Sequence, residues 1–157
     1  MNFVAIDFET ANRYRNSACA IGLARVEGSR VTQRVYRLIR PPFRWFEFSA
    51  LHGIDWPLVQ GAPTFAELWP SLAPLFCDVD FVAAHNAPFD AGVLRKTCEW
   101  YGLPMPDLPF RCTLKLARSW GLRPAKLSDV AAHLGIPLRH HHAGSDAAAC
   151  AKIMLAA

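Results

Sequence analysis

Two acidic residues, Asp7 and Glu9, follow a short apolar segment near the N-terminus, residues 3–6, which is rich in strand-forming side chains. Because side chains alternate along a β-strand, Asp7 and Glu9 would point to the same face of a sheet. Carboxylates beside a hydrophobic core are costly unless they are paired or bound to a cation. A divalent metal ion would offset both this cost and the repulsion between the two acids. The alternative is that the strand simply runs out into solvent at Asp7.

Two further acidic residues fall at the starts of predicted helices. Asp90 lies three residues into a helix predicted to follow a buried strand. An acid at a helix N-terminus is stabilised by ~0.3–1 kcal/mol through the helix dipole, so an ordinary acidic residue is the alternative interpretation. The face of the predicted last helix that carries Asp146 also carries Cys150, Ile153 and Ala157. This places a carboxylate on an apolar stripe, where a buried charge needs a partner.

A run of three histidines precedes Asp146. His141 lies five residues before Asp146, in the loop that leads into the last helix. A histidine with a pKa near ~6.5 is suited to take a proton from water at neutral pH. His140 and His142 flank it, so residue type alone does not select one of the three. A surface run without a role is the alternative.

The acids of these separate segments share a chemistry. Oxygen ligands suit hard cations such as Mg²⁺ or Mn²⁺ rather than zinc. Two such ions, ~3.5–4 Å apart, can generate hydroxide, orient a phosphodiester and stabilise the leaving oxygen. The four acids therefore predict hydrolytic phosphoryl chemistry, and they are Asp7, Glu9, Asp90 and Asp146.

The pattern of apolar residues and turn signals predicts the elements that must position these side chains. The predicted strands cover residues 3–10, 18–26, 31–39, 80–85 and 110–112. The predicted helices cover residues 64–76, 86–101, 113–120, 126–134 and 144–157. Residues 43–63 are expected to be irregular, and Pro70 and Pro74 to bend or interrupt the first helix. A three-stranded antiparallel meander followed by helix–strand–helix units predicts an α/β fold with a mixed sheet.

Length and composition set broad limits. The 157 residues predict one domain over 1–157, and the formal charge of +4, mainly from arginine, favours a polyanionic partner. Five scattered cysteines without a close pair predict reduced thiols, most of them core filler. Carboxylates by position 7 argue against a signal peptide, and no apolar run reaches membrane-spanning length. We therefore expect a cytoplasmic protein without a membrane partner.

Three segments resemble the exonuclease motifs of the DnaQ-like family, the DEDDh branch of the 3′–5′ exonucleases. Residues 7–10 resemble the first motif, Asp-x-Glu-Thr, and residues 85–90 resemble the second, His-Asn-x-x-Phe-Asp. Residues 141–147 resemble the third, His-x-Ala-x-x-Asp-Ala, and this spacing selects His141 among the three histidines. The motifs occur in the family's order and the resemblance spans nearly the whole chain. The histidine run is a departure from the pattern.

The resemblance implies an RNase H-like fold with a central mixed five-stranded sheet flanked by helices. It also implies two divalent cations, Mg²⁺ or Mn²⁺, and a nucleic acid with a single-stranded 3′ end. By motif, Asp7 bridges both ions, Glu9 and Asp146 complete the shell of the first, and Asp90 acts on the second. His141 is then the general base.

The same resemblance suggests residues that bind the terminal nucleotide. Those implied by the first two motifs are Phe8, Thr10, Asn86 and Phe89. His52, in a Leu-His-Gly-Ile stretch, either touches the terminal base or sugar or caps a turn. Candidate phosphate contacts, with solvated charges as the alternative, are Arg13, Arg15 and Arg111.

The leading functional hypothesis is a 3′–5′ exonuclease that removes nucleoside 5′-monophosphates from DNA in proofreading or repair. The main rival is the same chemistry on RNA, as in oligoribonuclease or RNase T relatives, because the 2′-hydroxyl is read by the shape of the pocket and no residue here decides between the two sugars. A non-catalytic nucleic-acid-binding module on the same fold is a third hypothesis. A subunit that works with a DNA polymerase is a fourth. The sequence predicts no oligomeric state.

Overall fold

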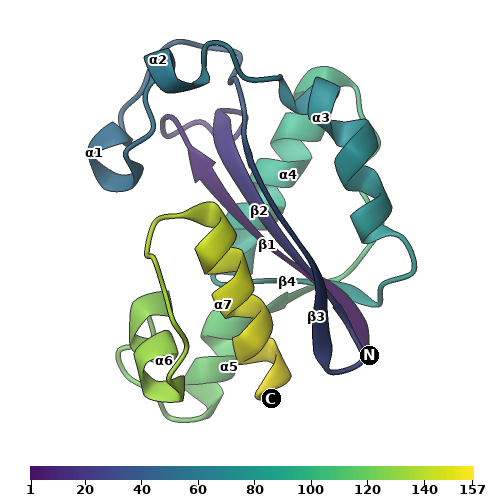
Figure 1. The fold of residues 1–157 in the computed structure, drawn as a ribbon, viewed down its shortest axis with the longest axis vertical. Coiled ribbons are helices and arrows are strands. Elements are labelled where there is room, and N and C mark those ends of the chain that lie inside the picture. The colour runs from purple at the N-terminus through teal and green to yellow at the C-terminus, as the bar shows by residue number, and fades with distance from the viewer.

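A computed structural model describes residues 1–157, and its strands form one mixed sheet in the order β3-β2-β1-β4-β5. Strands β1 (Asn2–Thr10), β2 (Ala18–Glu27) and β3 (Arg30–Leu38) are antiparallel neighbours. Strands β4 (Phe81–Ala84) and β5 (Phe110–Cys112) extend the sheet in parallel with β1. The predicted mixed five-stranded sheet is confirmed, with β1 at its centre (Figure 1).

The central strand β1 is covered on both faces. Its residues Val4, Ile6 and Phe8 belong to the core on one side, and Phe3 and Ala5 belong to the core on the other. This explains why the strand begins as a continuous apolar run rather than an alternating pattern. By the same alternation, the two acids that follow point to the face of Phe3 and Ala5.

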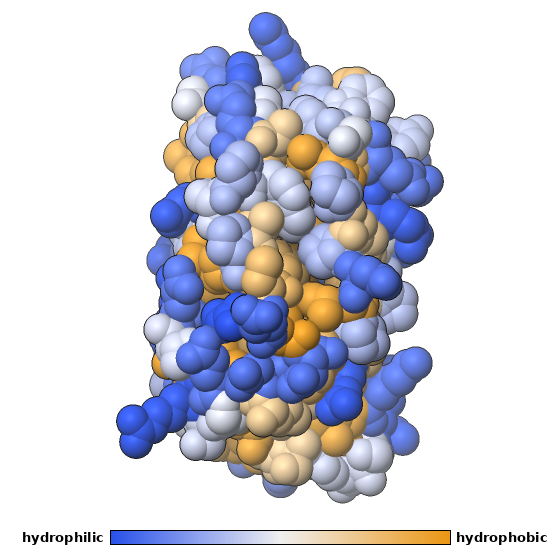
Figure 2. Space-filling model, turned by 90° about the vertical axis from the view of Figure 1, so that its right-hand side faces the viewer, coloured by the Kyte–Doolittle hydropathy of each residue, from blue (hydrophilic) through white to orange (hydrophobic).

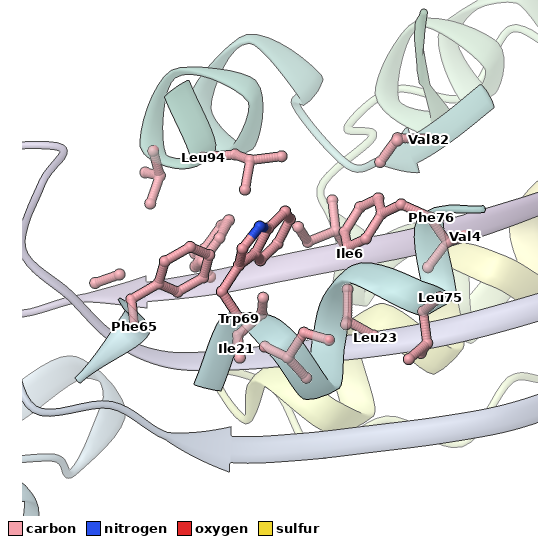
Figure 3. Close-up of a cluster of buried hydrophobic side chains, with 14 of the residues drawn as sticks. Val4, Ile6, Ile21, Leu23, Phe65, Trp69, Leu75, Phe76, Val82 and Leu94 are labelled. Carbon is pink, nitrogen blue, oxygen red and sulfur yellow. The ribbon is translucent and has the colours of Figure 1, made fainter. Parts of the chain in front are cut away.

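The first face of the sheet is covered by α3 (Phe65–Leu72), a 3₁₀ turn η1 (Ala73–Phe76) and α4 (Ala87–Tyr101). Thr64 and Glu67 form a capping box at the start of α3, as the predicted cap requires. The predicted helix 64–76 changes to 3₁₀ geometry at Ala73, next to Pro74, which has no N–H to donate. Figure 3 shows the core of this face, where labelled side chains from the sheet and these helices meet: Ile6, Ile21, Phe65, Trp69, Phe76 and Leu94.

The second face is covered by α7 (Ala143–Leu155), with α5 (Thr113–Ser119) and α6 (Leu127–Leu134) packed beside it (Figure 1). Small side chains dominate the buried part of α7, which lets this helix lie close to the sheet. The predicted helices of this half are confirmed. Leu134, on the same face of α6 as the buried Leu127, Val130 and Ala131, is 36% exposed.

The expectation that residues 43–63 are wholly irregular is also wrong. They contain two short helical turns, α1 (Ser49–His52) and α2 (Trp56–Val59). Gly53 ends α1 in the left-handed conformation, and the Asp55 side chain caps α2. The backbone amides of Glu47 and Phe48 donate to the Ala11 carbonyl, so this segment is fixed beside the end of β1.

Gly22 sets the distance between α7 and the sheet. It lies directly opposite Asp7 in the β1–β2 ladder. A Cβ at this position would overlap the carbonyl group of Ala143 and lie 2.7 Å from the Gly144 nitrogen, both in the α7 backbone. The absent side chain therefore allows the N-terminus of α7, with Asp146, to reach the acids of β1.

We expect Gly22→Ala to displace the start of α7. Overpacking of this kind costs roughly 1–3 kcal/mol of unfolding free energy, and the shift should also reduce any activity that needs Asp146 in place. Chemical denaturation measures the first effect and an activity assay the second. Gly61→Ala is the matched control, because nothing lies within 4 Å of a Cβ there. Equal stability of the two variants would contradict this role for Gly22.

On the face shown in Figure 2, hydrophobic atoms are visible mainly in recesses between hydrophilic side chains. None of the helices is both long and apolar enough to cross a membrane. All five cysteines are free, with Cys19, Cys98 and Cys150 buried in the core and Cys77 exposed.

Candidate active site

Three of the four predicted acids converge in space. Asp7 and Glu9 project from β1, and Asp146 projects from the first turn of α7, which covers the same face of the sheet. Their carboxylate oxygens lie within 4.8 Å of one another. Glu9 is only 8% exposed and Asp146 only 4% exposed, so this acidic cluster lies at the bottom of a depression rather than on an open surface.

Asp90, the fourth acid, contacts the backbone of β1 beside the cluster. Strand β4 pairs with β1 only as far as Ala5, so the Phe8 amide has no partner strand on that side. The Asp90 carboxylate in the first turn of α4 accepts the hydrogen bond from this amide at 2.9 Å. Asp90 is 1% exposed and lies outside the group of three carboxylates that approach within 4.8 Å. It therefore ties α4 to β1 between Asp7 and Glu9.

Burial and mutual repulsion make the ionised cluster unfavourable without a cation. Burial, reinforced by the charges of Asp90, Asp146 and Glu9, raises the pKa of Asp7 well above its usual range. Burial, with the nearby acids, raises the pKa of Glu9 to about 8. Burial likewise raises the pKa of Asp90 to about 8 and that of Asp146 to about 7, against the hydrogen bonds that each accepts. Clustered perturbed acids of this kind are typical of functional sites.

The donor set fits divalent metal ions. Within the acidic cluster, two buried carboxylate oxygens, Asp7 Oδ2 and Asp146 Oδ1, have no hydrogen-bond partner. Unsatisfied buried oxygens are rare in native proteins and call for an explanation such as a bound ion. Carboxylate oxygens alone suit Mg²⁺ or Mn²⁺, and the family resemblance implies such ions. The residues present can therefore hold them.

Without divalent ions, we expect the melting temperature to fall as the pH rises from about 5 to about 8. The raised pKa values, about 8 for Glu9 and Asp90 and about 7 for Asp146, mean that the folded protein retains protons that the unfolded chain has released. This contribution is complete below the unfolded carboxyl pKa of ~4 and is lost as the pH passes the folded values. Because metal binding needs ionised ligands, Mg²⁺ should raise the melting temperature more at about pH 8 than at about pH 6. Thermal melts with Mg²⁺ or chelator test this, and a flat profile without response to Mg²⁺ would contradict it.

The three histidines have different surroundings in the structure. His142 Nδ1 accepts a hydrogen bond from the Ser145 amide, and its ring packs on Tyr36 at 4.2 Å between centroids, so it caps α7. His140 and His141 stack on each other at 3.7 Å and, with Asp146, form a second group whose ligand atoms lie within 4.8 Å. The His141 amide also donates to Asp146 at 3.2 Å. Both His140 and His141 therefore face the acids, and His142 does not.

The acids form one wall of a cleft of about 720 Å³. Asn86, in the left-handed conformation before α4, lines this cleft together with Phe8 and the histidines 140 and 141. Three exposed cations that have no ion-pair partner line the same cleft and form what we call its cationic wall: Arg118, Arg123 and Lys126. Sequence reasoning missed them, because nothing in their spacing indicates that α5 and the loop before α6 face the acids.

A smaller pocket of about 260 Å³ adjoins the cleft and shares Phe8 and Glu9 with it. Its remaining lining residues are Thr10, Phe48, Leu51, His52 and Phe89. Both ring nitrogens of His52 have protein partners: Nε2 donates to the Thr10 carbonyl at 2.8 Å, and Nδ1 accepts from the Ile54 amide. The nitrogens of His52 therefore serve the turn, as in the alternative that this residue caps it. One side of the ring also lines the pocket. Sequence reasoning missed Phe48 and Leu51, although Leu51 directly precedes His52 on α1 and Phe48 is the residue before this helix.

The three candidate phosphate contacts lie in different environments. Arg13 pairs with Glu47 at 2.8 Å, and Arg111 lies over the Phe81 ring at 4.1 Å, away from the cleft. Arg15 donates to the Pro88 carbonyl at 3.0 Å and lies over Phe89, which lines the smaller pocket. Only Arg15 is therefore placed next to the candidate site.

Comparisons with known proteins identify the family of this chain. A family model described as "Exonuclease" (RNase T) matches residues 4–154. The chain is 30% identical over 158 residues to DNA polymerase III PolC-type of Clostridium perfringens, covering 97% of this chain and 11% of that protein. It is 30% identical over 161 residues to the PolC-type enzyme of Thermotoga maritima, covering 98% and 12% respectively. The chain thus spans about a ninth of the length of these relatives.

Solved structures show the same fold. Exonuclease X in complex with 5′ overhanging duplex DNA superposes with a TM-score of 0.79 at 22% identity, covering 98% of this chain and 89% of that one. Escherichia coli exonuclease I in complex with a dT13 oligonucleotide superposes with a TM-score of 0.83 at 16% identity, covering 99% and 40%. At such identities, the likeness is evidence for the fold.

Proposed function

This chain belongs to the RNase T/DEDDh exonuclease family, and from this premise we propose that it hydrolyses DNA from the 3′ end, in proofreading or repair, and releases nucleoside 5′-monophosphates. The observation that carries the proposal is the convergence of buried carboxylates from β1 and α7, with two oxygens left free for a cation. A non-catalytic module would have no need of such a costly cluster. The PolC-type relatives favour DNA as the substrate and a replicative polymerase as the partner.

The smaller pocket suits the terminal nucleoside of the cleaved strand. Its lining is largely apolar, with the rings of Phe8, Phe48 and Phe89 available to a base. The Thr10 side chain adds a polar group that can meet the sugar, whereas the His52 ring, whose nitrogens are both hydrogen-bonded within the protein, contributes a packing surface. Because this pocket shares Phe8 and Glu9 with the cleft, a nucleoside bound there brings its 5′ phosphate to the acidic cluster.

In this proposal each of the four acids has a defined role. Asp7, Glu9 and Asp146 would hold the divalent ions, and Asp90 would complete the site while its carboxylate accepts the hydrogen bond of the Phe8 amide. Bound ions of this type orient a phosphodiester, lower the pKa of water and neutralise charge in the transition state. His141, beside Asp146 at the mouth of the cluster, takes the proton of the attacking water. His142 holds the start of α7 instead.

The cationic wall of the cleft binds the backbone phosphates of the strand upstream of the cleaved bond. Arg118, Arg123 and Lys126 line the same cleft as the acids, and none of the three lines the nucleoside pocket. Cations without acidic partners are available to phosphates. Arg123 also donates to the carbonyls of Arg118 and Leu122, which holds this wall in place.

We expect the double variant Arg118→Ala/Lys126→Ala to bind single-stranded oligonucleotides more weakly. Each lost phosphate contact should reduce the slope of log affinity against log salt by ~0.7 for single strands. Binding at several salt concentrations measures this slope. Hydrolysis of a nitrophenyl ester of a nucleoside 5′-monophosphate, which lacks upstream phosphates, should fall much less. Lys115→Ala, an exposed cation of α5 outside the cleft, is the control. An unchanged slope in the double variant would show that these cations do not contact the phosphates of the bound strand.

The proposed function is tested by digestion of 5′-labelled oligonucleotides. Matched DNA and RNA strands, single-stranded and duplex, are incubated with Mg²⁺, Mn²⁺ or chelator and followed as a ladder over time. We expect DNA to shorten stepwise from its 3′ end only when a divalent ion is present. Digestion of RNA in preference to DNA would assign the same chemistry to RNA, and no digestion of any strand would refute the proposal.

A further inference from the structure

A further hollow is separate from both the cleft and the nucleoside pocket. It has a volume of about 470 Å³ and is formed between the loop after β1 and the exposed side of α4. It shares no lining residue with the other two. Its walls are Arg13, Tyr14, Arg15, Asn16, Lys96, Glu99 and Trp100, and none of these side chains is aliphatic.

Exposed aromatic rings gather at this aromatic hollow. Tyr14 is 58% exposed and Trp100 is 52% exposed. Each ring contacts a further exposed ring edge-on: Tyr14 meets Trp45 at 5.8 Å, and Trp100 meets Phe43 at 5.3 Å. A single exposed aromatic residue is ordinary, but a contiguous group on one surface marks a binding site. Exposed rings interleaved with cations are typical of surfaces on which nucleic acid bases stack.

Arg15 connects the aromatic hollow to the nucleoside pocket. Its guanidinium has no carboxylate partner, in contrast to Arg13 and Lys96, which pair with Glu47 and Glu99. It lies over Phe89, a wall of the nucleoside pocket, and donates to the Pro88 carbonyl. Gly92 makes room for it, because a Cβ there would overlap the Arg15 side chain. A free positive charge thus lies between the two sites.

We propose that the aromatic hollow binds unpaired nucleotides of the complementary strand when the substrate is a duplex with a recessed 3′ end. The inference rests on the proposed function, in which the cleaved strand ends in the nucleoside pocket. Nucleic acid that continues past that pocket must then belong to the other strand. The hollow adjoins this pocket through Arg15, which lines the hollow and lies over Phe89, and it shares no lining residue with the cleft. Its rings and the free Arg15 charge match unpaired bases and a backbone phosphate.

The test compares binding of three DNA probes in chelator, which prevents hydrolysis: a duplex with a 5′ overhang, the same duplex with a blunt end, and the single strand with the same 3′ end. The overhang carries 2-aminopurine, whose fluorescence falls when it stacks on a ring. We expect wild type to bind the overhanging duplex more tightly than the blunt one and to quench the probe. Trp100→Ala and, separately, Tyr14→Ala should lose about 5- to 50-fold in affinity for the overhanging duplex only, with loss of quenching.

Trp120→Ala, an exposed tryptophan at the end of α5 that is 38% exposed, is the matched control and should bind all three probes as wild type does. Equal affinity of wild type for overhanging and blunt duplexes would overturn the inference. So would an equal loss on the single strand, which would place the cleaved strand in the hollow, or no loss on any probe, which would leave the surface to a protein partner. Digestion of the single strand in Mg²⁺ is measured in parallel, so failure of the proposed function is recognised separately.

Discussion

Asp7→Asn should reduce hydrolysis from the 3′ end by ~10³-fold or more while making the metal-free protein more stable. Asparagine keeps the shape of the side chain and removes its charge. Loss of ~4 kcal/mol of transition-state stabilisation corresponds to a factor of this size. The opposite effect on stability follows from the site itself. Burial and the charges of Asp90, Asp146 and Glu9 raise the pKa of Asp7, so this ionised carboxylate opposes folding when no cation is bound.

The two readouts separate a metal-binding role from a structural one. Thermal melts of Asp7→Asn in chelator should give a higher melting temperature than wild type, and the rise that Mg²⁺ produces in wild type should be largely lost. A residue that merely supports the fold would lower the melting temperature instead. Asp107→Asn, which removes an exposed carboxylate in the loop before β5, should change neither property. Full activity in Asp7→Asn would refute the catalytic assignment of the cluster.

The sheet, and the face of the central strand on which Asp7 and Glu9 lie, follow from local sequence patterns. The apolar run before Asp7 predicts a strand buried on both faces, and the alternation of side chains places Glu9 beside Asp7. Asp146 was predicted to lie on a buried face, and α7 buries it against that same side of the sheet. The hydrogen bond from the Phe8 amide to Asp90 was not predicted, because it depends on where β4 ends.

Other parts of the site depend on long-range packing that no local pattern records. Arg118 and Lys126 face the acids only because α5 and α6 pack beside α7. The close approach of α7 depends on Gly22, which a sequence pattern cannot distinguish from a glycine in an exposed strand. The turns around His52 carry recognisable caps, Asp55 and Gly53, but they are short and were outweighed by the aromatic and proline content around them.

The histidine run illustrates the same division between local pattern and packing. Three consecutive histidines are equivalent by residue type, and only the motif spacing selects His141. Packing then fixes His142 as the cap of α7, leaving His140 and His141 stacked beside Asp146. Burial, with the neighbouring His140, lowers the pKa of His141. At neutral pH this ring is therefore in the basic form that can accept a proton from water.

His141→Ala should reduce kcat by ~10²–10⁴-fold, the usual contribution of a general base, with little change in Mg²⁺ affinity. In wild type, kcat should rise with pH and level off once His141 is deprotonated, below the ordinary histidine value of ~6.5, and the variant should lose this rise.

His140→Ala should retain most of the activity, and His142→Ala should lower the melting temperature through loss of the cap to Ser145. The kinetics are measured at saturating metal so that the carboxylates stay ionised. Because His140, His141 and Asp146 could also hold an ion together, a parallel fall in metal affinity and kcat in His141→Ala would identify this histidine as a metal ligand instead of the base.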